Sequence, residues 1–87
     1  MTALYKLTFA RQVRKKDLPK IPLKDRSRIL ETVEDLQYNP RPFGALRLTS
    51  REEYRIRQGD YRILYVIEDQ IKIIEIRHIA QRGEVYR

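Results

Sequence analysis

The sequence predicts an α+β fold in which two helices from the N-terminal half cover an antiparallel sheet formed mainly by the C-terminal half. Apolar residues recur at near-helical spacing between Leu23 and Gln37. From Glu53 onward, Tyr- and Ile-rich runs alternate with turn residues, which is typical of successive hairpins. With 87 residues, no internal repeat and no linker, we expect a single domain spanning residues 1–87.

The first half of the chain is predicted to contain one strand and two helices. Residues 4–9 alternate between apolar and polar side chains and are expected to form a strand. Residues 10–18 are expected to form a brief, highly charged helix, because Pro19 and Pro22 bracket a break after it. Residues 23–37 are expected to form the main helix, with its apolar stripe facing the sheet.

The second half is predicted to be β structure. Residues 45–48 are either a short strand or extended coil. Strands follow at residues 54–58, 61–67 and 71–79, separated by the turns Gly59-Asp60 and 68–70. Both helices would then pack on one face of the sheet and leave the other face open for function.

A two-residue turn at Gly59-Asp60 would place Arg57 opposite Arg62 and Arg55 opposite Leu64. The three arginines would share the open face. Like charges directly opposite each other destabilise a strand pair, so this pairing suggests that a polyanion binds there. The alternative is that the charged side chains of a half-exposed sheet simply face the solvent and bind no ligand. The residues expected on the helix-covered face are Tyr54, Ile56, Ile63, Tyr65 and Ile67.

The second turn decides which residues of the last strand join the arginine face. A two-residue turn would place Glu75 and Arg77 on that face. His78 would then lie on the core side, as a hydrogen-bonded core histidine rather than an acid–base group. A three-residue turn would invert this arrangement.

Composition narrows the class of partner. The net charge is +7 at pH 7 and the sequence pI is about 10.0, so the protein should attract polyanions, with nucleic acid first among them. No apolar run approaches the roughly 20 residues of a membrane-spanning helix, so a soluble cytoplasmic protein is expected. With no cysteine and one histidine, we expect neither a metal site nor a cofactor.

Two segments carry a family resemblance. The run Tyr-Arg-Ile-Arg-Gln-Gly-Asp-Tyr-Arg-Ile-Leu-Tyr at residues 54–65 and the ending Arg-Gly-Glu-Val-Tyr-Arg at 82–87 closely resemble the RelE family of toxin–antitoxin ribonucleases. The resemblance spans nearly the whole chain and implies a RelE-like β-α-α-β-β-β(-β) fold. It also implies cleavage of mRNA in the ribosomal A site, without a metal, by attack of a ribose 2′-hydroxyl on the adjoining phosphate. Translation would thereby be inhibited.

The resemblance also implies the site residues. Arg57, Arg62, Arg82 and Tyr86 match catalytic positions, and Arg55 matches a paired basic position that binds RNA together with Arg57 and Arg62. We add Arg77 as a phosphate-binding residue because of its expected place on the arginine face. Lysine in some members stands where this chain has Arg55 and Arg57, and Gln81 stands where His or Lys is common. Because arginine does not deprotonate, the general base is either Tyr86 or a ribosomal group.

The partners that the resemblance implies are a small, acidic, RelB-like antitoxin and the 70S ribosome with its mRNA. Operator DNA would be bound only indirectly, through the antitoxin complex, and no membrane is involved. Two alternatives remain open. One is a ParE-like inhibitor of DNA gyrase, and the other is a non-catalytic nucleic-acid-binding or corepressor module, for which the positive charge alone would suffice.

Overall fold

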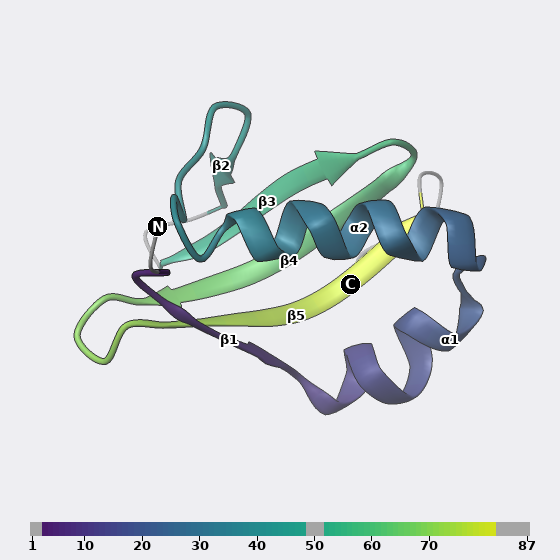
Figure 1. Cartoon of the computed structure of the whole chain (residues 1–87), viewed down its shortest axis with the longest axis horizontal. Helices are drawn as coiled ribbons and strands as arrows, with labels where there is room; N and C mark the ends of the chain where they lie inside the picture. The colour runs from purple at the N-terminus through teal and green to yellow at the C-terminus, as the bar shows by residue number, and fades with distance from the viewer. Residues whose placement is uncertain (1–2, 49–51, 82–87) are drawn as a thin grey trace.

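A computed structural model describes residues 3–48 and 52–81 of the chain (Figure 1). Helices and strands follow one another in the order expected of an α+β protein. They are β1 (Lys6–Phe9), the π-helical turn η1 (Val13–Asp17), α1 (Leu18–Lys20), α2 (Leu23–Asp35), β2 (Leu46–Arg47), β3 (Glu53–Gln58), β4 (Tyr61–Glu68) and β5 (Ile73–Gln81). No helix in these two stretches is long and apolar enough to cross a membrane.

The five strands form one sheet in the order β1-β5-β4-β3-β2. All neighbouring pairs are antiparallel except β1 and β5, which run parallel. These two strands are far apart in the sequence, so no hairpin turn forces them to run in opposite directions. The segment left open between strand and coil, residues 45–48, contains β2, which pairs with β3 at the edge of the sheet.

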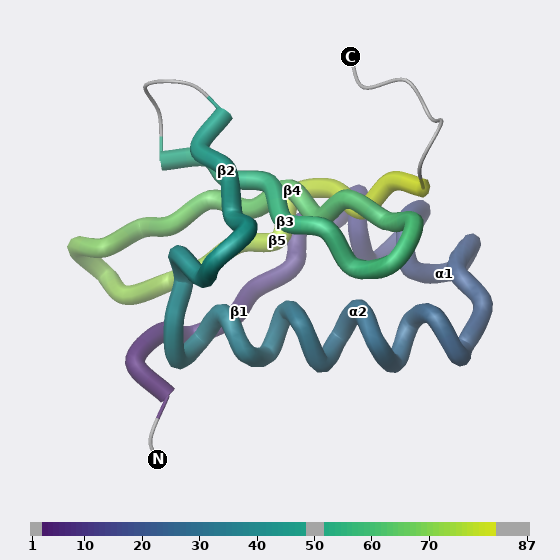
Figure 2. The backbone as a smooth tube through the Cα atoms, turned by 90° about the horizontal axis from the view of Figure 1, so that it is seen from above, coloured from purple at the N-terminus to yellow at the C-terminus, as the bar shows by residue number. Residues whose placement is uncertain are grey.

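The main helix α2 covers one face of the sheet (Figure 2). Its apolar stripe buries Ile29, Val33 and Leu36, and these side chains join a core that includes Ile63 and Tyr65 from β4. Burying each such aliphatic side chain stabilises the fold by roughly 1.5–3 kcal/mol. The predicted main helix and the predicted α+β fold are therefore confirmed, although α2 ends at Asp35, two residues earlier than expected.

The first helical segment continues further than the sequence predicted. The expectation that it ends at Leu18, before Pro19, is wrong, because α1 runs through Pro19 to Lys20. Pro19 lies in the first turn of α1, where a missing N–H group costs little. The chain becomes extended only at Ile21, which precedes Pro22.

A buried carboxylate joins this segment to the sheet. Asp17 is only 5% exposed. It accepts hydrogen bonds from the Ile79 backbone N–H at 2.9 Å and from Gln12 Nε2 at 3.0 Å, and its Oδ2 atom lies 2.7 Å from His78 Nδ1. Since β1 ends at Phe9, the Asp17 side chain supplies the acceptor that a longer β1 would have offered to β5.

Replacing Asp17 with alanine is expected to lower the free energy of unfolding by about 1–3 kcal/mol, because it leaves the buried Ile79 N–H without an acceptor. Asp17→Asn, which keeps one acceptor oxygen, should lose less. Urea unfolding followed by circular dichroism would measure both changes. Glu34→Ala, at an exposed position of α2, is the control. Equal stability of Asp17→Ala and the wild type would show that Asp17 does not hold the segment on β5.

Candidate nucleic-acid interface

The β3–β4 hairpin sets the geometry of the predicted arginine face. Arg57 lies directly opposite Arg62, and Arg55 lies opposite Leu64, as the sequence predicted. Arg57 is exposed, whereas Arg55 and Arg62 are half-buried. The face opposite to α2 therefore carries three guanidinium groups within one hairpin, and the described part of the chain gives Arg55 and Arg57 no ion-pair partner.

The register of this hairpin is fixed at its turn and against α2. Gly59 has φ +60° at the first turn position, a conformation that favours glycine and suits a tight two-residue hairpin turn. On either side of the turn, Thr32 donates a hydrogen bond to Gln58 Oε1 at 2.8 Å, and the Tyr61 hydroxyl donates to Asp25 at 3.1 Å. Both contacts hold the hairpin tip on α2, so the arginines remain on the opposite face.

The last strand departs from the prediction at a β-bulge. The loop before β5 has four residues, 69–72, instead of two, but an even number keeps Glu75 on the arginine face, opposite Val66. One extra residue then interrupts the ladder, since Leu64 pairs with His78 and Tyr65 with Ile76. The bulge turns His78 toward the face that Leu64 occupies. Its predicted place on the core side is therefore wrong, and His78 is half-buried beside Asp17.

Arg77 is exposed and forms an ion pair with Glu75 at 2.9 Å. Both side chains are partly exposed, so the pair contributes little to stability. Glu75 offsets part of the positive charge that Arg77 was predicted to offer to phosphate. Phosphate binding by Arg77 stays a prediction, and the remaining predicted site residues, Arg82 and Tyr86, lie outside the described residues.

A cavity of about 350 Å³ opens beside Arg55 and Arg57. Its other walls, which the sequence did not predict, belong to the loop before β2 and to β2 itself. The feature of the sequence that could have indicated this cavity is Phe43, which stands between Pro42 and Gly44. Proline and glycine favour a turn, and a turn exposes the side chain between them. The lining residues are Phe43, Gly44, Leu46, Arg55, Ile56 and Arg57.

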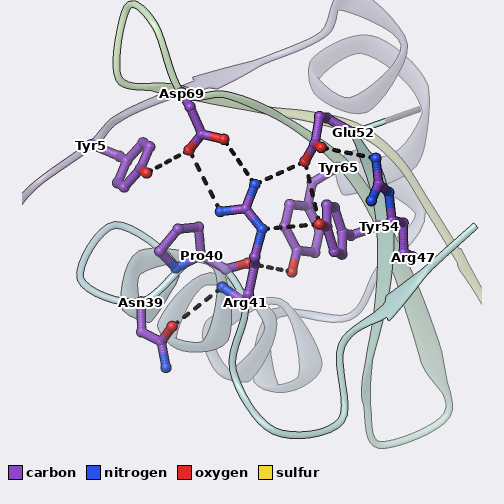
Figure 3. Close-up of polar contacts among 9 residues, drawn as sticks. All are labelled: Tyr5, Asn39, Pro40, Arg41, Arg47, Glu52, Tyr54, Tyr65 and Asp69. Atoms are coloured by element: carbon purple, nitrogen blue, oxygen red, sulfur yellow. Dashed lines mark hydrogen bonds and ion pairs between the residues drawn. The ribbon is translucent and has the colours of Figure 1, made fainter. Parts of the chain in front are cut away.

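The loop that carries Phe43 is anchored by Arg41 (Figure 3). The Arg41 guanidinium donates to Asp69 and to Glu52, each at 2.8 Å, and its Nε atom donates to the Tyr54 hydroxyl at 2.9 Å. The same guanidinium lies 5.4 Å from the centre of the Tyr54 ring. Nearby, the Tyr65 hydroxyl donates to the Pro40 carbonyl oxygen at 2.7 Å. The loop is thus tied to β3, to β4 and to the loop before β5.

Hydrogen bonding within this network lowers the pKa values of its carboxyl groups and raises that of its arginine. Hydrogen bonds from Arg41 lower the pKa of Glu52 and that of Asp69, to which Tyr5 also donates. The hydrogen bonds to Asp69, Tyr54 and Glu52 raise the pKa of Arg41 above its usual value. Burial raises the pKa of Tyr65, so its hydroxyl stays protonated and can donate to Pro40.

A second and larger cavity, of about 490 Å³, lies between α1 and the end of β5. Asp17, His78 and Tyr61 are among its lining residues. In residues 3–48 and 52–81, no group of three or more His, Cys, Asp or Glu side chains could hold a metal ion. On the face opposite to α2, the guanidinium groups of Arg55, Arg57 and Arg62 can contact a polyanion.

Comparison with known proteins assigns the family. Residues 8–86 match the family model described as the ParE toxin of type II toxin–antitoxin systems. The chain is 37% identical over 76 residues to a putative RelE1 toxin of Methanocaldococcus jannaschii, a match that covers 83% of this chain and 84% of that protein. It is 38% identical over 74 residues to a RelE toxin of Mycobacterium tuberculosis, covering 83% of this chain and 76% of that protein.

A solved structure agrees with these matches. The crystal structure of the archaeal RelE–RelB complex from Pyrococcus horikoshii superposes with a TM-score of 0.79 at 32% identity, covering 94% of this chain and 99% of that one. The fold is that of a toxin from a type II toxin–antitoxin system. This chain belongs to the RelE/ParE toxin family, and the relatives it matches are named as RelE toxins.

Removing the Arg41 side chain should destabilise the protein more at neutral pH than in acid. Arg41 lowers the pKa values of Glu52 and Asp69, so this stabilisation is present above their ordinary values of about 4 and is lost as the pH falls through the lower folded values. Urea unfolding of the wild type and Arg41→Ala at pH 7 and near pH 3 should show the difference between them shrinking. Arg28→Ala, on the exposed side of α2, should show no such trend. A difference that is independent of pH would mean that Arg41 acts through packing alone.

Proposed function

We propose that this protein is a ribosome-dependent mRNA endoribonuclease that cleaves its substrate in the ribosomal A site and so inhibits translation. The observation that carries the proposal is the direct pairing of Arg57 with Arg62, with Arg55 on the same open face. Like charges in directly opposite positions of a strand pair repel each other. A bound phosphodiester would convert that repulsion into two charge-assisted contacts.

The proposed reaction needs no nucleophile from the protein. A ribose 2′-oxygen loses its proton and attacks the adjoining phosphorus, and the bond from phosphorus to the 5′-oxygen of the next nucleotide breaks. The products are a 2′,3′-cyclic phosphate and a 5′-hydroxyl, whose oxygen takes up a proton. The protein has to align the three reacting atoms and stabilise the added negative charge, which preorganised cations do without a metal or a cofactor.

In this proposal Arg57 and Arg62 hold the scissile phosphate from opposite strands, and Arg55 binds the neighbouring backbone. Arg82 would stabilise the leaving oxygen and Tyr86 would orient the nucleotide, as the family resemblance implies. Arg77 would contact RNA at the margin of the face, where Glu75 already neutralises part of its charge. Since arginine does not deprotonate, the proton of the 2′-hydroxyl goes to Tyr86 or to a ribosomal group.

The proposed partners follow from this activity and from the relatives. RelE is bound to RelB in the Pyrococcus horikoshii structure, so we propose a small acidic antitoxin of that kind for this chain. The net charge of +7 suits both an acidic antitoxin and ribosome-bound mRNA. Operator DNA would be reached only through the antitoxin complex, and the site of action would be the cytoplasm, where ribosomes are.

The matching family model is described as the ParE toxin, and this description suggests a second candidate function. Under this alternative the chain would inhibit DNA gyrase, and the arginine face would not bind mRNA. A non-catalytic, nucleic-acid-binding role is the third candidate. Two observations distinguish the three candidate functions: whether mRNA is cut, and whether the cut requires Arg57 and Arg62.

Brief induction of the wild-type chain should produce cuts within codons of cellular mRNA, mapped by primer extension, and 70S ribosomes should be required for the same cuts in vitro. Arg62→Ala and Arg57→Ala should each reduce cleavage by about 100-fold or more, in the range of losing one preorganised donor to a developing anion. Tyr86→Phe should weaken cleavage, because it removes only a hydroxyl group.

Arg14→Ala is the matched control, because Arg14 is exposed on η1 and its replacement removes the same positive charge outside the β3–β4 hairpin. This variant should cleave like the wild type. Growth arrest with intact mRNA would refute the proposed function and direct attention to a gyrase supercoiling assay. Binding of RNA without any cleavage would support the non-catalytic role.

A further inference from the structure

An exposed aromatic side chain lies at the tip of a tight turn before β2. Phe43 is the most exposed of the large apolar residues in the described part of the chain, with a relative exposure of 106%. It occupies the second position of the turn Pro42–Ala45, which is closed by the hydrogen bond from the Ala45 N–H to the Pro42 carbonyl oxygen at 3.0 Å. Gly44 follows with φ +96°, as a type II turn requires. The turn therefore projects Phe43 away from the core.

This aromatic ring borders a cavity with two chemically different sides. Phe43 and Leu46 supply exposed apolar surface, and Arg55 and Arg57 supply positive charge. The volume of about 350 Å³ lies at the small end of the roughly 300–1,000 Å³ that ligand sites span. β2 pairs with β3 opposite Arg55 and Tyr54, so Ile56 and Arg57 lie beyond the paired stretch and line the cavity.

The loop that carries the ring is anchored before any ligand arrives. Arg41, two residues before Phe43, is held by Asp69, Glu52 and Tyr54 (Figure 3). The Pro40 carbonyl oxygen is held by the Tyr65 hydroxyl. A loop ordered in this way loses little conformational entropy when a ligand binds.

The combination fits one nucleotide of single-stranded RNA better than it fits a purely apolar or purely anionic ligand. A nucleobase offers a flat π face that stacks on an aromatic ring, and its phosphate offers the charge that arginine binds. We propose that Phe43 is a base-stacking residue, on which one nucleobase rests while Arg55 and Arg57 contact the adjoining phosphates. This inference rests on the proposed function, and extends it by assigning a nucleotide subsite beside the cleavage residues.

Stacking on a phenyl ring does not discriminate strongly among bases, because every base has a π face. Phe43 would therefore fix how deeply the RNA strand sits on the arginine face, and not which sequence is bound. That depth would set which phosphate lies between Arg57 and Arg62.

Binding of a short, unstructured, fluorescein-labelled RNA to the isolated full chain, followed by anisotropy at low salt, tests the assignment. Phe43→Ala should weaken binding by roughly 5- to 150-fold, the range that a single base-stacking contact gives. Phe43→Trp should keep the affinity and, as the only tryptophan in the chain, should change its emission when RNA binds. An RNA of the same length that lacks its bases should bind the wild type and Phe43→Ala equally well.

Ile71→Ala is the matched control, because Ile71 is a large apolar residue that is 64% exposed in the loop before β5, and it should bind RNA like the wild type. Thermal unfolding would check that each variant is folded. Unchanged RNA binding by Phe43→Ala would overturn the inference, and so would a loss of antitoxin binding with RNA binding retained, since Phe43 would then serve a protein partner. Base-dependent RNA binding in a protein that never cuts mRNA would overturn the proposed function alone.

Discussion

The pairing register of β3 and β4 is the constraint on which the rest of this molecule depends. Side chains alternate along a strand, so a slip of β4 by one residue against β3 would turn Arg62 into the core and expose Ile63 and Tyr65. The Gly59 turn and the contacts of its two flanking residues with α2 prevent that slip. The same register that closes the core therefore presents the cations.

The protein uses its arginines in two different ways. Arg41, Arg47 and Arg77 are paired with carboxylates of the same chain, and Arg41 orders a loop through three neighbours. Arg55 and Arg57 have no such partner among the described residues, and Arg57 lies directly opposite Arg62. Positive charge that the fold does not neutralise is available to an anion from outside, which is why the proposed RNA site lies on this face and not around Arg41.

In the proposed reaction the RNA substrate carries its own nucleophile, so the protein does not have to supply one. In the proposed function the chain contributes the placement of charge: helix α2 covers one face of the sheet, and the three arginines of the β3–β4 hairpin lie on the opposite face. The loop that Arg41 anchors extends that face with an aromatic ring. In these proposals two adjacent elements have different tasks. The β3–β4 hairpin binds the phosphate that is cleaved, and the loop before β2 positions the RNA by stacking on a base.

The sequence by itself determined the features that depend on local rules. Glycine at the first position of a two-residue turn fixed the pairing of Arg57 with Arg62, and helical periodicity identified α2. The part of the candidate site that lies on the hairpin, including Arg55, could therefore be placed on one face before the structure was known. The roles of Arg82 and Tyr86 rest on the resemblance alone.

Only the tertiary structure decided the features that depend on distant contacts. The bulge that turns His78 away from the core accompanies Asp17, which lies 62 residues before Ile79 and accepts its N–H. The parallel placement of β1 and the cavity beside Phe43 likewise join segments far apart in the chain. A period-2 pattern cannot reveal an inserted residue, because the partner that stabilises the bulge is supplied by another part of the fold.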